Sequence, residues 1–199
     1  MVLRMWLAPL ALAAAAAAGT AALDDGRLDP QWFGGPGVEF RETGDVDYVW
    51  MKPGFTAEGH SFWIKPWDEP AWLGKQRDTV DAQRAEELTK QMHGRFKAAL
   101  ATALRGRAEV SLYRGNVVVH GRLVDVNTTK AAKFSGSATW DIKFLDAKSG
   151  ELLMAVHHRT INANFMSDVP SRIWKWMGDF GADLRYDFPD YAKGKPRHT

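Results

Sequence analysis

The clearest alternation of apolar and polar positions in the chain lies between Gly136 and Asp146. Two sets of side chains alternate there, one apolar (Ala138, Trp140, Ile142 and Phe144) and one polar (Ser137, Thr139, Asp141 and Lys143). A period of two places the two sets on opposite faces of a pleated strand. The pattern therefore predicts a strand of an antiparallel sheet with one buried and one wetter face.

Helical spacing is strongest between Thr79 and Leu104. Apolar residues recur there every three or four positions and form a stripe along one side (Ala85, Leu88, Met92, Phe96, Ala99 and Ala103). A second helix is predicted to begin near Asp168, with Ile173, Met177, Phe180 and Leu184 on one side. Because glycine disfavours helix, Gly178 and Gly181 make this helix dependent on docking to the sheet.

Five further segments have the composition of strands: residues 44–52, 60–65, 108–112, 117–127 and 151–161. In residues 117–127 the apolar positions change parity between Leu123 and Val124, which predicts a β-bulge. Residues 146–150 between the last two strands have the composition of a tight turn.

The order of these elements predicts an α+β fold. We expect a two-layer sandwich, with an antiparallel, or mixed, sheet of four to five strands and two helices packed on one face. The chain divides into a signal peptide (1–22), an irregular lead-in with one strand (23–59), a single α+β domain (60–188) and a flexible basic tail (189–199).

The first 22 residues have the pattern of an export signal. Arg4 precedes an apolar run from Trp6 to Ala18, and small residues follow up to Ala22. This is the order of a secretory signal peptide, and we expect cleavage between Ala18 and Leu23. The sequence therefore predicts a periplasmic protein. The alternative is an uncleaved helix that anchors the protein to the inner membrane, since the apolar stretch approaches a spanning length.

The composition of the 199-residue chain excludes several classes of function. The 26 basic and 24 acidic side chains are interspersed and give a net charge of +2, so no nucleic-acid surface is expected. The chain has no cysteine, which excludes thiolate catalysis, cysteine-ligated metals, disulfides and thiol lipidation.

The segment from Leu145 to Leu152, Leu-Asp-Ala-Lys-Ser-Gly-Glu-Leu, resembles the "D-x-x-T-G-E-hydrophobic" hairpin of the bacterial envelope proteins grouped as domain-of-unknown-function family 3313. The resemblance spans about residues 60 to 186 and includes a C-terminal helix with Trp174 and Trp176. It implies an envelope location and the fold described above, and it implies no activity. Members of that family are typically lipoproteins, whereas this chain lacks the cysteine that would accept the lipid.

Polar residues of the predicted sheet offer candidates for chemistry. Asp141 could pair with His157 or His158, and Asp125 with Arg122 or Arg159. Neighbouring residues of a strand point to opposite faces, so His157 and His158 cannot bind one ion together. We therefore expect no metal site, no cofactor and no catalytic residue, and keep a polar sheet-face site as a hypothesis (His120, Asp141, His157 and His158).

Three tryptophans, Trp63, Trp67 and Trp72, lie close together in a proline-containing stretch. They either cover the open end of the sheet as a small core or form an exposed surface for a sugar or a protein partner. The sequence as a whole predicts a non-enzymatic envelope protein that assists other envelope proteins through protein contacts. The alternatives are a periplasmic module that binds a glycan or small molecule through these tryptophans, and an uncharacterised hydrolase.

Overall fold

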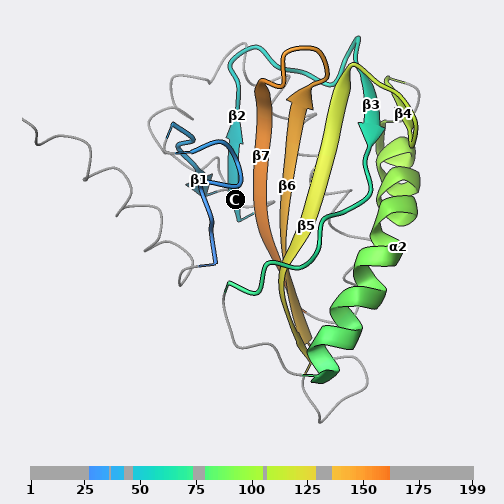
Figure 1. The fold of residues 1–199 in the computed structure, drawn as a ribbon. Coiled ribbons are helices and arrows are strands. Elements are labelled where there is room, and N and C mark those ends of the chain that lie inside the picture. The colour runs from blue at the N-terminus through green and yellow to red at the C-terminus, as the bar shows by residue number, and fades with distance from the viewer. Residues whose placement is uncertain are drawn as a thin grey trace, which may run out of the picture.

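A mixed seven-stranded sheet with one helix on one face makes up the described part of the chain (Figure 1). The computed structural model describes residues 27–35, 37–42, 47–73, 79–104, 107–128 and 136–161. The helix is α2 (Thr79–Leu104). The strands are β1 (Arg41–Glu42), β2 (Tyr48–Met51), β3 (Ser61–Ile64), β4 (Glu109–Ser111), β5 (Val117–Thr128), β6 (Gly136–Asp146) and β7 (Leu152–Ile161), in the spatial order β1-β2-β7-β6-β5-β3-β4.

An antiparallel meander of β5, β6 and β7 forms the centre of the sheet. On one side of it β2 pairs antiparallel with β7, and on the other β3 runs parallel to β5 and β4. After β3 the chain continues along β5. The backbone N–H groups of Lys65, Asp68 and Ala71 donate to the carbonyls of Val119, Gly121 and Leu123 at 3.0, 3.0 and 2.9 Å.

The predicted α+β class is confirmed, and so is the helix from Thr79 to Leu104. The sheet has seven strands rather than four to five, because all six segments with strand composition pair in it and the short β1 adds a seventh strand at one edge. The predicted bulge is also present, as a register shift between Leu123 and Asp125 where β5 pairs with β6. The second predicted helix, with Trp174 and Trp176, lies outside the described residues.

The main hydrophobic core lies between α2 and the sheet (Figure 1). The helix buries a stripe of Ala85, Leu88, Met92, Phe96, Leu100 and Leu104. In the last turns Leu100 and Leu104 are the buried residues, and Ala99, expected in the stripe, is half-buried. The side chain of Ala103, also expected there, lies outside the described part of the structure. The larger side chains keep a regular spacing of four from Leu88 onward and fill more of the space beneath the helix.

Trp67 joins the helix to the sheet. Its indole lies 5.7 Å from the ring of Phe96 on α2 and 5.6 Å from the ring of Trp140 on β6, both in edge-on geometry. Trp140, Ile142 and Phe144 are fully buried on this face, as the alternation predicted. The indole of Trp67 also lies directly on Gly121 of β5, where a Cβ atom would come within 2.7 Å of the ring.

The expectation of a wetter second face was wrong. Thr139 and Asp141, on the polar side of β6, are both 0% exposed. The N-terminal cover segment, a name used here for residues 27–35 and 37–40, lies on this side of the sheet, opposite α2 (Figure 1), and its Asp29 pairs with Arg122 beside Asp141. The sheet is therefore an interior layer with cover on both faces.

The close contact between Trp67 and Gly121 can be tested by substitution. Gly121→Ala should lower the free energy of unfolding by about 1–3 kcal/mol, because the added methyl group overpacks a position already filled by the indole. Gly94→Ala is the matched control. It lies in the interior of α2 with nothing within 4 Å of an added Cβ, and it should raise stability by roughly 0.5–1 kcal/mol. Urea unfolding of both variants measures the difference, and equal effects would contradict the packing described here.

Candidate functional site

The side chains of Asp29, Arg122, Asp141 and His157 form a continuous polar network beneath the N-terminal cover segment. Arg122 donates from Nε and Nη2 to Oδ2 of Asp141 at 2.9 and 2.8 Å, and from Nη2 to Oδ2 of Asp29 at 3.1 Å. The other carboxylate oxygen of Asp141 lies 2.6 Å from Nδ1 of His157. One buried carboxylate thus joins a guanidinium and an imidazole, and we call these four residues the buried network.

Strand register brings three of these residues together. Arg122 on β5 lies directly opposite Asp141 on β6, and Asp141 lies directly opposite His157 on β7. Directly opposed residues of an antiparallel sheet project from the same face within reach of each other. The sequence indicated the pair of Asp141 and His157, and the structure brings them into contact. Asp29 comes from the N-terminal cover segment and was not foreseen.

Trp32 holds the N-terminal cover segment over this network. Its indole ring is packed against two cations, with Cζ of Arg122 at 4.5 Å and Nζ of Lys143 at 4.1 Å from ring centroids. Its backbone carbonyl accepts a hydrogen bond from Nζ of Lys143 at 2.8 Å, and its indole N–H donates to Asp68 at 3.4 Å. Cation–π contacts strengthen as the cation leaves water, so this ring stabilises the charges that it covers.

Apolar contacts complete the cover. Leu28, Phe33, Val38 and Phe40 pack with Ala155 of β7 into a second, smaller core. The rings of Phe33 and Phe40 meet at 5.0 Å in edge-on geometry. Gly34 and Gly35 have φ values of 115° and 108°, a left-handed conformation that suits glycine and lets the chain turn back over the sheet. At its start the segment is tied to β5 by the ion pair of Arg27 and Asp125, 2.9 Å long.

Burial and neighbouring charges shift the pKa values of two groups near the network, Lys143 and Asp47. Burial lowers the pKa of Lys143, and Asp68, Asp141 and Asp29 oppose that effect. Burial works to raise the pKa of Asp47, which precedes β2, but hydrogen bonds from His158 and from the backbone N–H of Arg159 on β7 outweigh it and hold the pKa below its usual value. The N–H of Arg159 lies 2.6 Å from Oδ2 of Asp47.

The geometry of Asp141 and His157 is that of a carboxylate orienting an imidazole, an arrangement used in general base catalysis. A general base must also reach a substrate. Asp141 is 0% and His157 2% exposed, and Arg122 is 8% exposed. The pair is enclosed by its own protein on all sides, so its role in the described structure is to satisfy and position buried charge.

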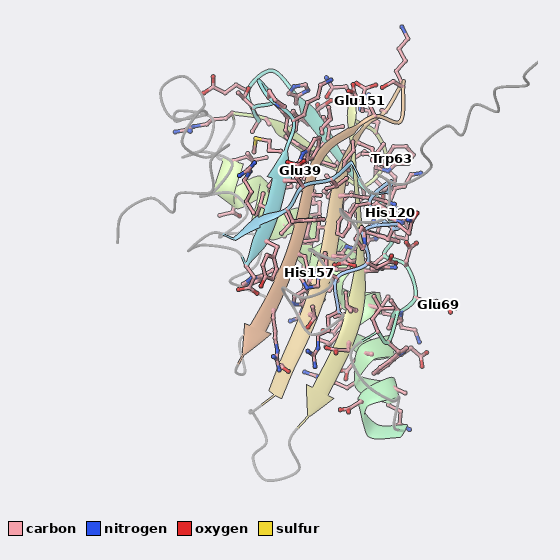
Figure 2. All side chains as sticks on the ribbon, turned by 90° about the vertical axis from the view of Figure 1, so that its left-hand side faces the viewer. Glu39, Trp63, Glu69, His120, Glu151 and His157 are labelled. Atoms are coloured by element: carbon pink, nitrogen blue, oxygen red, sulfur yellow. The ribbon has the colours of Figure 1, made fainter. Side chains whose placement is uncertain are left out.

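The other candidates for the polar sheet-face site lie elsewhere. His120 is on the same face, but its Nε2 contacts Oδ1 of Asp68 at 2.8 Å at the margin of the network. His158 projects from the opposite face, beside Trp140, and its Nδ1 lies 3.2 Å from Oδ2 of Asp47. Asp125 pairs with Arg27 rather than with Arg122 or Arg159. Figure 2 views the sheet from the side of the N-terminal cover segment, with α2 behind it and His120 and His157 labelled.

The three neighbouring tryptophans do not share one surface. Trp67 is buried between α2 and the sheet, and Trp72 is partly buried against the same core. Trp63 is half-buried on β3, where its indole N–H donates to the carbonyl of Leu112 at 3.0 Å and Nζ of Lys65 lies 5.0 Å from the ring centroid. The small-core interpretation therefore describes Trp67 and Trp72, and Trp63 bridges β3 to the chain after β4.

No group of three or more histidine, aspartate or glutamate side chains in the described residues is arranged to hold a metal ion. Within the same residues no helix combines the length and apolar character needed to cross a bilayer.

Comparison with known proteins yields only remote similarity. No protein-family model and no curated protein matches the chain, so the resemblance to family 3313 stays a prediction. Among solved structures, a variant of the PelC dodecamer from Paraburkholderia phytofirmans matches 68% of this chain and 95% of its own with a TM-score of 0.44 and 8% identity. A Xanthomonas campestris protein of domain-of-unknown-function family 330 matches 74% and 90% with a TM-score of 0.37 and 8% identity. At these scores the likeness carries nothing about function.

Removal of the central carboxylate tests the buried network. Asp141→Asn should lower the free energy of unfolding by about 3 kcal/mol or more, because Arg122 is left buried without its main counter-charge. Glu86→Gln is the matched control, an acid-to-amide change in the exposed 2.6 Å pair with Lys90 on α2, and should cost at most about 0.5 kcal/mol. Chemical denaturation measures both, and a loss in Asp141→Asn as small as in the control would contradict the network.

Proposed function

We propose that this chain is an exported, non-enzymatic protein of the bacterial cell envelope that assists other envelope proteins through protein contacts. The order of a basic start, an apolar run and small residues in positions 1–22 supports export to the periplasm. The absence of cysteine is consistent with a protein held there neither by a thiol-linked lipid nor by disulfides.

The observation that supports a non-catalytic role is the burial of the acid–base pair. Asp141 and His157 are the residues best placed for proton transfer, and both are enclosed beneath the N-terminal cover segment. Arg122 donates charge-assisted hydrogen bonds to the remaining oxygen of Asp141 and a further one to Asp29. A hydrolase would have to use other residues or displace the cover.

A glycan-binding module has less support than a protein-contact role. Sugar-stacking sites need aromatic faces that are open together, whereas Trp67 packs against Phe96 and Trp140 in the core. Trp72 is partly buried against the same core, and Trp63, which lies outside it, is half-buried.

Export and protein contact can be tested in one bacterial strain. The full chain is produced with a photo-crosslinking residue at Glu69, Lys90 or Arg114, three exposed positions on different parts of the described surface. We expect the mature chain in the periplasmic fraction, with a mass that shows cleavage between Ala18 and Leu23. We also expect a crosslink to an envelope protein from one position and not from all three.

Two outcomes would contradict the proposal. If the chain keeps its N-terminal residues and stays in the cytoplasm, residues 1–22 do not act as an export signal, and the proposal loses its main support. A chain that is exported but crosslinks from none of the three positions would favour the binding-module or hydrolase alternative.

A further inference from the structure

The N-terminal cover segment is held together by its own backbone and lies on the sheet as a separate unit. The N–H groups of five of its residues donate to carbonyls of the same segment (Trp32, Phe33, Gly34, Gly35 and Val38). Its ties to the sheet involve side chains, with Asp29 and Trp32 on Arg122 and with Arg27 on Asp125. The antiparallel pairing of β5, β6 and β7 is complete without it. The contact therefore has the form of a peptide bound to a protein surface.

A tight turn presents the two central anchors of this segment together. The N–H of Trp32 donates to the carbonyl of Asp29 at 3.2 Å, and the N–H of Gln31 donates to Oδ1 of Asp29 at 3.1 Å. Aspartate at the first position of a turn and proline at the second, here Pro30, favour this conformation. A carboxylate three positions before an indole is thus a recognition element that the local sequence organises in advance.

Arg122 receives both anchors. Its Nη2 donates to Oδ2 of Asp29 at 3.1 Å, and its Cζ lies 4.5 Å from the centroid of the Trp32 ring. Lys143 supplies a second cation, 4.1 Å from that ring, and donates to the carbonyl of Trp32 at 2.8 Å. Guanidinium groups bind carboxylates and stack on aromatic faces. The sheet face therefore matches the charge and the shape of this turn.

A chain that displaces the segment has to bring the same chemistry. Without Asp29 and Trp32, the buried guanidinium of Arg122 loses one charge partner and one aromatic partner, which costs free energy. A second chain with a carboxylate three positions before an aromatic ring restores both contacts. A chain that lacks these groups does not. The face thus selects its partner by the pattern that its own cover carries.

We propose that the sheet face beneath the N-terminal cover segment is a recognition surface for another protein, whose segment carries a carboxylate three positions before an aromatic side chain and takes the place of residues 27–40. This inference rests on the proposed function, because it names the kind of segment through which an envelope protein is contacted. In the isolated chain the cover segment occupies the surface. A tethered competitor of this kind acts at an effective concentration on the order of millimolar, so the surface favours a partner that also makes contacts elsewhere.

A fluorescent peptide with the sequence of residues 27–40 is the probe. The purified full chain is titrated into it, and fluorescence anisotropy measures binding. The unsubstituted chain should bind the peptide weakly, because its own segment competes. In the full chain with Asp29→Asn and Trp32→Ala the tethered competitor is weakened, so the peptide should bind about tenfold more tightly or better.

Two peptide variants are the controls. A peptide with Asp29→Asn and Trp32→Ala should not bind at concentrations where the native peptide saturates the doubly substituted chain. A peptide with Glu39→Gln loses one negative charge at a side chain that is 83% exposed, and it should bind as the native peptide does. Circular dichroism checks the fold of the doubly substituted chain. The single variant Asp29→Asn is a milder change and should give the same gain to a smaller extent.

Four results would overturn the proposal. The first is no binding of the native peptide by either substituted chain. The second is equal affinity of that peptide for the unsubstituted and doubly substituted chains, which would place its binding elsewhere. The third is equal binding of the native and doubly substituted peptides. The fourth is a dimer of the unsubstituted chain in sedimentation velocity that dissociates in the doubly substituted chain, which would assign the surface to a second copy of this chain.

The peptide titration is separate from the test of the proposed function. It uses purified protein, and it needs neither export nor an envelope partner. A chain that is exported and crosslinks to an envelope protein but does not bind the peptide would contradict the recognition surface alone. A chain that binds the peptide but remains in the cytoplasm would contradict the proposed function alone.

Discussion

The ion pair between Arg122 and Asp141 is the interaction on which the polar face of this sheet and its N-terminal cover depend. It places a guanidinium and a carboxylate in a layer where they are almost wholly removed from water. Desolvation of two charges costs several kcal/mol per ion unless hydrogen bonds and further charges compensate. Here Asp29, His157 and the ring of Trp32 supply that compensation.

The compensation has a structural consequence. Asp29 and Trp32 belong to the N-terminal cover segment, so the charges on the sheet determine where that segment lies, and the segment keeps water from the charges. The apolar side of the segment, with Leu28, Phe33 and Phe40, adds hydrophobic burial against β7. A polar sheet face that would ordinarily be solvated thus becomes a second interior, and the acid–base pair within it is closed to substrate.

Much of the fold could be predicted from the sequence because its signals are local. The alternation from Ala138 to Phe144 and the helical spacing from Ala85 to Phe96 depend only on neighbours in the chain, and both correspond to the observed elements. The change of parity at Leu123 indicated the bulge for the same reason. Strand register explains why Asp141 and His157 could be paired in advance.

The cover could not be predicted in this way, because it depends on contacts between distant parts of the chain. Asp29 and Arg122 are 93 positions apart, and nothing near either residue indicates the other. The sequence did contain one indication of the cover. The segment interpreted as irregular from its glycines has many large apolar residues: Leu28, Trp32, Phe33, Val38 and Phe40. Irregular backbone and exposure are separate properties, and large apolar residues in such a segment indicate that it packs against something.

Hydrogen exchange of the N-terminal cover segment measures the central claim most directly. The N–H groups of Phe33 and Gly35 donate to the carbonyl of Pro30 at 3.1 and 3.0 Å, and they are protected only while the segment stays on the sheet. We expect both to exchange far more slowly than in an unfolded chain, and Asp29→Asn to speed their exchange while the amides of β6 keep their protection. Exchange of these two groups at the rate of a free peptide in the unsubstituted protein would contradict the account.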